Sequence, residues 1–152
     1  MKKTSNLGGL LGVCALIFTL CAFLFPIAPG IQAGPEELIR GYDFVFTNPA
    51  APFTISATGG LVAMFVLFIV GAAFELLGVA FGWYGGKFGG FLSIVGGLCM
   101  AVAGLLAFLA PAMVETSAFQ LSLAWGFVAT GIASLLAAGT EIFVGVKAFL
   151  AK

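Results

Sequence analysis

The fold is decided by the stretch Gly59–Gly82, "GGLVAMFVLFIVGAAFELLGVAFG", in which Glu75 is the sole charged residue. A helix that crosses the hydrocarbon core of a bilayer, about 30 Å thick, needs about 20 mostly apolar residues rising about 1.5 Å each. The stretch satisfies this requirement and predicts a membrane-spanning helix. The presence of a carboxylic acid inside such a helix then needs a separate explanation.

The composition of the whole chain agrees with a membrane protein. Of the 152 residues, 62% are hydrophobic and 8% are charged, whereas a soluble domain has about 25% charged residues; the mean hydropathy is +1.21. Six basic and six acidic residues cancel, so the chain lacks the basic character of a nucleic-acid-binding protein. Histidine is absent, and Cys14, Cys21 and Cys99 lie in apolar runs without a C-x-x-C pair. We expect a single integral membrane domain over 1–152, with no enzymatic activity, metal, cofactor or nucleic-acid partner.

Four apolar runs predict an all-α bundle of four transmembrane helices, at about 7–25, 57–82, 88–110 and 121–148. Pro26 and Pro111 mark the ends of the first and third helices. The start "MKK" followed by an apolar run is also compatible with a secretory signal peptide. The run is longer than a usual signal-peptide core and "IQA" is a poor cleavage site, so a retained helix is favoured.

The lysines predict the orientation, because short cytoplasmic loops are enriched in Lys and Arg. With a cytoplasmic N-terminus, only Arg40 among the basic residues falls outside; the cytoplasmic set is Lys2, Lys3, Lys87, Lys147 and Lys152. We therefore predict a multi-pass protein of the cytoplasmic membrane with both termini cytoplasmic and the lipid bilayer as its surroundings.

The outer loop, at about 26–56, is long enough to form a structure of its own. "GPEELIRG" predicts one short helix, while "YDFVFT" and "FTIS" alternate like the strands of an extracellular β-hairpin. Its aromatic side chains either pack onto the bundle, which is favoured, or face a partner; they are Tyr42, Phe44, Phe46 and Phe53.

The segments "MKKTSNLGGLLGV", "RGYDFVF" and "GGFLSIVGGLCMAVAGLLAFLAP" give the chain a resemblance to small four-helix membrane proteins of Gram-positive bacteria. That resemblance implies a four-helix membrane fold and implies no catalytic or binding residue. The layout is also loosely similar to the claudin arrangement, but the paired loop cysteines and the Trp signature of that pattern are missing. "NLGGLLGV" and "KFGGFLSIVGG" further suggest an internal repeat of two parallel helical hairpins, or a chance match of apolar sequence.

Small residues predict where the helices touch, since helices in lipid associate through close backbone approach and polar contacts. On the second helix these residues flank Glu75, and on the fourth they recur every four residues with Glu141 among them. The predicted packing residues are Gly71, Ala72, Gly78, Ala129, Ala133, Ala137 and Gly145.

Glu75 and Glu141 are predicted to lie at similar depths in the inner leaflet and to face neighbouring helices. One hypothesis makes them part of a proton or cation path. The favoured hypothesis makes each a packing device, which accepts a hydrogen bond from a donor such as Thr140 or extends toward the inner surface. Pairing with a lysine such as Lys87 is left open. The hydroxyls of Thr19, Ser93, Thr130 and Ser134 are expected to bond to their own backbone.

The sequence thus favours a non-enzymatic structural or accessory component of a bacterial cytoplasmic membrane, which contacts a membrane-protein partner or forms a homo-oligomer. The alternative is a small oligomeric transporter or channel that uses Glu75 and Glu141 for proton or cation coupling.

Overall fold

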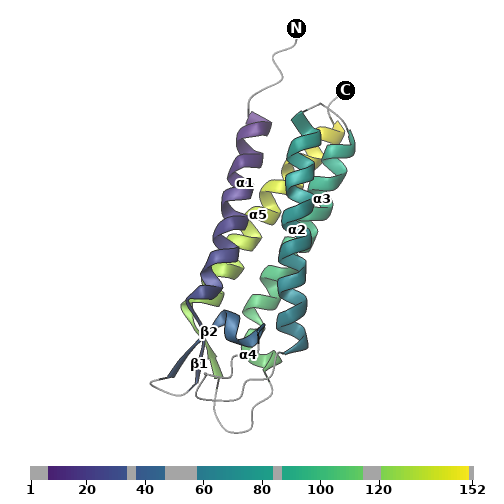
Figure 1. The fold of residues 1–152 in the computed structure, drawn as a ribbon. Coiled ribbons are helices and arrows are strands. Elements are labelled where there is room, and N and C mark those ends of the chain that lie inside the picture. The colour runs from purple at the N-terminus through teal and green to yellow at the C-terminus, as the bar shows by residue number, and fades with distance from the viewer. Residues whose placement is uncertain (1–6, 34–36, 47–57, 84–86, 115–120, 151–152) are drawn as a thin grey trace.

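The computed structural model describes residues 7–33, 37–46, 58–83, 87–114 and 121–150, and is mostly helical (Figure 1). Four helices are long and apolar enough to cross a membrane. They are α1 (Leu7–Leu24), α2 (Gly59–Trp83), α3 (Lys87–Phe108) and α5 (Trp125–Leu150). Their bounds follow the predicted ranges except at the start of α5, where residues 121–123 form a strand instead.

The four helices enclose one shared interior. Helix α3 packs extensively on both α2 and α5, while α1 has its larger interface with α5 and a smaller one with α2. The first turn of α1 and the last turn of α5 lie at one end of the bundle, called here the terminal end, and the strands lie at the opposite sheet end (Figure 1). Helix α1 therefore packs more on α5 than on α2, its neighbour in the chain.

Prolines end two of the long helices. Pro26 lies in the short 3-10 helix η1 (Phe25–Ile27) that follows α1 directly. Pro111 lies in the one-turn helix α4 (Ala110–Met113), just beyond the end of α3 at Phe108. A proline has no backbone N–H to donate and its ring clashes with the carbonyl four residues earlier, so each helix ends within a few residues of its proline.

A small antiparallel sheet covers the sheet end. Strand β1 (Pro29–Ala33) lies between β2 (Glu37–Arg40) and β3 (Leu121–Leu123). Ile31 pairs with Ile39 on one side and with Leu123 on the other, and its side chain is fully buried against the bundle. The central strand therefore joins the loop after α1 to the segment before α5.

The secondary structure predicted for the loop after α1 is partly wrong. Residues 37–40 of the predicted helix "GPEELIRG" form strand β2, and the predicted strand at "YDFVFT" begins with the 3-10 helix η2 (Gly41–Phe44). The second predicted strand, "FTIS", lies outside the described residues. A helix of six or so residues forms few hydrogen bonds to offset the cost of its nucleation. Strand β2 instead pairs with β1 along its whole length.

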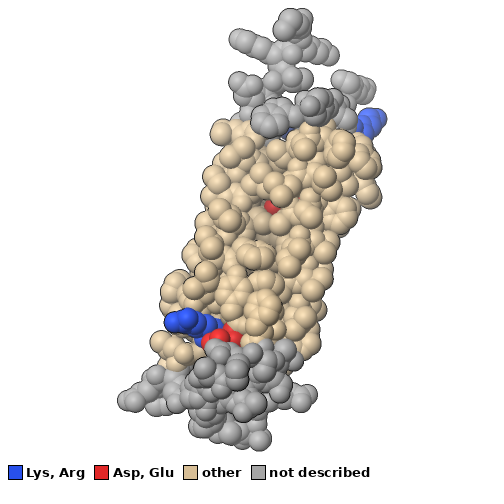
Figure 2. Space-filling model, in the orientation of Figure 1, with Lys and Arg blue, Asp and Glu red and all other residues tan. Residues whose placement is uncertain are grey.

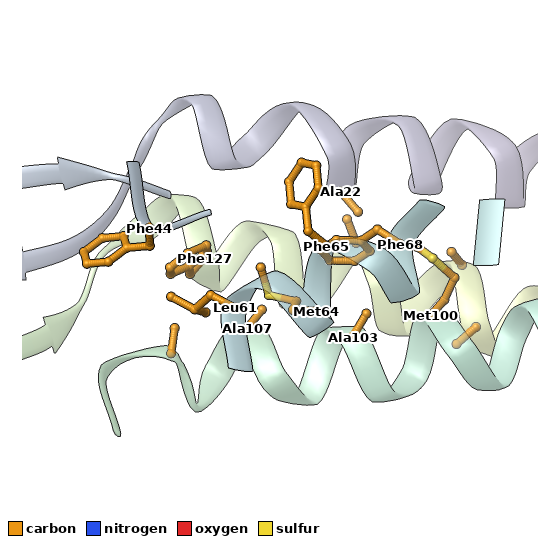
Figure 3. Close-up of a cluster of buried hydrophobic side chains, with 14 of the residues drawn as sticks. Ala22, Phe44, Leu61, Met64, Phe65, Phe68, Met100, Ala103, Ala107 and Phe127 are labelled. Carbon is orange, nitrogen blue, oxygen red and sulfur yellow. The ribbon is translucent and has the colours of Figure 1, made fainter. Parts of the chain in front are cut away.

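A cluster of buried apolar side chains fills the bundle between the sheet and the middle of the helices (Figure 3). Phe44 and Phe127 lie at the sheet end of the cluster, and Met100 lies at the other end. Between them, Leu61, Met64 and Phe68 of α2 are completely buried. This half of the interior is therefore closed by apolar packing.

Candidate functional site

Glu75 lies on the buried face of α2, nearer the terminal end than the sheet end, and its side chain is 0% exposed. Gly96 of α3 makes room for it: a Cβ on Gly96 would lie 3.0 Å from the Glu75 nitrogen and 3.1 Å from its Cγ. On the other side, the Thr19 hydroxyl of α1 donates a hydrogen bond to Glu75 Oε2. Three helices thus meet at this carboxyl.

Glu141 occupies the matching position on α5 and is also 0% exposed. The neighbouring glycine of α3, Gly97, lies against it, since a Cβ there would be 3.3 Å from the Glu141 Cβ. The Ser93 hydroxyl, one turn earlier on α3, lies close to the Glu141 carboxyl. Neither carboxyl oxygen of Glu141, however, has a hydrogen-bond partner within the described chain.

Together these side chains form a layer, called here the polar layer, to which each long helix contributes one residue. Thr19 is 5% exposed and Ser93 is 2% exposed, so the whole layer is shielded from solvent. Glu75 and Glu141 both pack against the same turn of α3. Adjacent glycines on α3 bring them together, because Gly96 admits Glu75 from one side and Gly97 admits Glu141 from the other.

The polar layer differs from what the sequence predicts for hydroxyl groups. Thr130 donates to the Gly126 carbonyl at 2.8 Å and Ser134 to the Thr130 carbonyl at 2.7 Å, as expected for hydroxyls in helices. Thr19 instead bonds to another helix. Thr140, the expected donor to a glutamate, donates to its own Leu136 carbonyl at 2.7 Å. In the sequence, Ser93 could have been recognised as a site residue from its position one helical turn before Gly97. No comparable sequence feature marks Thr19.

The two carboxyls do not reach the surface of the terminal end. Glu75 lies eight residues before the end of α2 at Trp83, about 12 Å along the axis. Both glutamate side chains are 0% exposed, which disagrees with the hypothesis that they extend toward the inner surface. Lys87 is exposed at the start of α3 and does not partner them.

Small residues set the spacing of the helices around the layer. Along α3, Gly90, Gly97 and Gly104 recur every seven residues and lie against the backbone of α5, a period that suits helices crossing at about 20°. On α2, Gly78 approaches the backbone of Ser93 in the same way. Among the predicted packing residues, those buried are Gly71, Gly78, Ala133, Ala137 and Gly145, and those half-buried are Ala72 and Ala129.

Gly97→Val is expected to lower the free energy of unfolding by about 1 to 2 kcal/mol, because overpacking at a tight contact forces the helices apart. A Cβ at Gly97 would lie 2.9 Å from Ile142 Cγ1 and 3.0 Å from the Ala138 carbonyl oxygen. Thermal unfolding in mild detergent measures the effect. Gly139→Val on α5 is the matched control, since nothing lies within 4 Å of a Cβ there. Equal losses in both variants would contradict the packing assignment.

The aromatic residues predicted in the outer loop have different surroundings at the sheet end. Phe44 is buried, with 1% of its surface exposed. Tyr42 is half-buried, donates its hydroxyl to the Phe23 carbonyl and packs edge-on against Phe65; burial raises the pKa of its phenol. Phe46 is 61% exposed. Phe53 lies outside the described residues.

The site contains oxygen ligands but no cluster of the usual metal-binding residues. Within the described ranges, three or more His, Cys, Asp or Glu residues nowhere gather around one point. The fold and site define a bundle of four apolar helices with an acid pair at its centre. Comparison of the chain with protein-family models, curated proteins and solved structures gave no match.

Proposed function

We propose that the protein is a multi-pass integral membrane protein of a bacterial cytoplasmic membrane. The observation that carries the proposal is the inverted placement of its side chains. Large apolar residues are exposed along the helices, including Leu20, Ile69 and Phe143, whereas Glu75 and Glu141 are fully buried. The lateral face between the two ends is almost entirely uncharged (Figure 2). Such a surface is stable in lipid and would aggregate in water.

The proposed orientation has the terminal end in the cytoplasm. Lys87 and Lys147 are exposed near that end, and Arg40 is exposed at the sheet end. The positive-inside rule then assigns the sheet to the outer side of the membrane.

In this membrane the protein acts as a non-enzymatic accessory component that contacts a protein partner, either a second copy or another membrane protein. Leu38 and Phe46 support this role, since both are large, apolar and more than half exposed at the sheet end, although one edge of the Phe46 ring packs against Phe65 of α2. The apolar cluster that includes Leu61, Phe68 and Phe127 speaks against a solute path through a single chain. Transport by an oligomer, the alternative from the sequence, would need a polar route between chains.

The contact role is tested by native mass spectrometry from mild detergent. We expect the wild-type protein to appear in a complex, and we expect Phe46→Ser to dissociate it because an apolar anchor is lost. Leu150→Ser is the matched control, as Leu150 is 76% exposed at the opposite end. A wild-type monomer in every detergent, or a complex that Phe46→Ser leaves intact, would remove the basis for this role.

The orientation is tested separately by cysteine labelling. In a variant without Cys14, Cys21 and Cys99, Arg40→Cys should react with an impermeant maleimide added to intact cells. Lys147→Cys should react only after the cells are opened. The reverse pattern would refute the proposed orientation while leaving the contact role standing.

A further inference from the structure

The polar layer holds buried polar atoms that the protein itself does not satisfy. Glu75 Oε1 and both oxygens of Glu141 are buried and have no hydrogen-bond partner among the described residues. Buried polar groups in native proteins are nearly always paired, and an exception needs a cause. A pure packing device would have its carboxyl oxygens hydrogen-bonded to donors on the neighbouring helix, whereas the nearby donor for Glu141, the Ser93 hydroxyl, forms no hydrogen bond of regular geometry with it.

Protons alone do not complete the layer. Adding a proton to Glu141 would neutralise its charge, but the new O–H group would need an acceptor within hydrogen-bond distance. The Ser93 hydroxyl is the polar group close to the Glu141 carboxyl, and within the described chain neither Glu141 oxygen forms a hydrogen bond of regular geometry. A cation, in contrast, would neutralise negative charge and be coordinated by oxygen lone pairs of both carboxylates at once. The interior offers no lysine or arginine for this purpose, since the buried charged residues in the described part of the chain are the two glutamates.

We infer that the polar layer is a binding site for one small hard cation, held between the carboxylates of Glu75 and Glu141 with the hydroxyl oxygens of Thr19 and Ser93 as further ligands. Each long helix supplies one of these residues, so the ion would join all four helices. The inference does not depend on the accessory role proposed above, because an ion can be held here without passing through the membrane.

The donor atoms define the class of cation. All four side chains present oxygen, which suits alkali and alkaline-earth ions, and none presents the imidazole or thiolate that zinc and copper favour. Charge balance then distinguishes two cases. A divalent ion neutralises both carboxylates, whereas a monovalent ion leaves one negative charge, which one retained proton would neutralise. Starting from two protonated acids, binding would release two protons per divalent ion and one proton per monovalent ion.

The test uses the full-length protein in detergent, freed of metal ions and kept in N-methylglucamine chloride. Sodium, lithium, potassium, calcium or magnesium chloride is then added at constant ionic strength. We expect one ion to raise the unfolding temperature saturably, because a ligand bound only by the folded state stabilises it. Proton release in weak buffer, measured in the same titration, gives the charge of the ion.

Variants assign the effect to the polar layer. Glu141→Gln and Glu75→Gln should abolish the saturable shift, and Ser93→Ala should weaken ion affinity roughly tenfold or more. Thr140→Val is the matched control, since its hydroxyl lies in the same helix but bonds to its own backbone; it should retain full binding. If a Gln variant does not fold, Ser93→Ala still decides.

Three outcomes would overturn the inference. The first is the absence of a saturable shift with any ion. The second is a shift that survives in the Gln variants, which would locate the ion elsewhere. The third is stability that depends on pH while no metal ion has any effect, which would indicate protons or a buried water in place of a cation. None of these results bears on the contact role, which is measured through Phe46.

Discussion

Phe127→Ala is expected to lower the free energy of unfolding by about 3 kcal/mol, through the cavity it leaves at the sheet end. The Phe127 side chain is fully buried. Its ring lies between two glycines of the sheet and the helix η2, which together are called here the cap: Gly30 of β1 and Gly41 of η2. A Cβ on Gly30 would lie 2.9 Å from its Cε2, and one on Gly41 would lie 2.8 Å from its Cε1. The value is at the lower end for Phe→Ala in packed cores, because removal from water contributes less in the membrane setting proposed above.

Thermal unfolding in detergent measures this loss. Phe143→Ala is the control, as Phe143 lies on the same helix and is 58% exposed; it should change the unfolding temperature little. Hydrogen exchange should further show faster exchange in β1 for Phe127→Ala, because the ring supports the cap. If Phe127→Ala were as stable as the control, the cap would not depend on this contact.

Glu141→Met is expected to raise the free energy of unfolding by about 2 to 4 kcal/mol in metal-free buffer. An unpartnered buried carboxyl costs stability, and an apolar side chain of similar size removes that cost. Met is flexible enough to fill the same space against Gly97. A gain in stability on removing a polar group would mean that the wild-type protein keeps Glu141 at a cost, as proteins do at functional sites.

Two further variants test whether the gain in stability comes from removal of the unpartnered carboxyl. Glu141→Gln keeps the size and polarity of the side chain, so it should bring little or no gain. Glu75→Met should gain less than Glu141→Met, because it leaves the Thr19 hydroxyl without its acceptor. Should Glu141→Met prove less stable than wild type in metal-free buffer, the carboxyl would have a stabilising partner, and the inference of an unsatisfied layer would be wrong.

Local patterns were enough to predict the long helices. The apolar run at Gly59–Gly82 determines α2 by its own length and hydropathy, and Pro26 and Pro111 act within a few residues of themselves. The sequence predicts that the last helix starts at about residue 121, whereas α5 begins at Trp125. The reason is a contact with a segment distant in sequence. Leu121–Leu123 forms β3 by pairing with β1, and nothing within those three residues specifies a partner so distant in sequence.

The cap likewise shows that local sequence patterns do not specify partners distant in sequence. "GPEELIRG" carries helix-start signals, yet its residues 37–40 form a strand because β1 lies alongside to accept their hydrogen bonds. Tyr42 and Phe44 were recognised as candidates for packing onto the bundle, and both contact it. Both lie in a 3-10 helix in place of the predicted strand, and this helix begins at Gly41, where Phe127 and Pro26 leave no room for a Cβ.

For the site, the sequence by itself determined that two acids lie inside apolar helices at similar depths, because a charge in a hydrophobic run is visible without any structure. Only the tertiary structure decided what surrounds them. Thr19 and Thr130 are alike in sequence terms, yet Thr130 bonds to its own helix and Thr19 to Glu75. The physical reason is that helix propensity and hydropathy act within a segment, whereas the partners of a buried carboxyl depend on how four helices close around it.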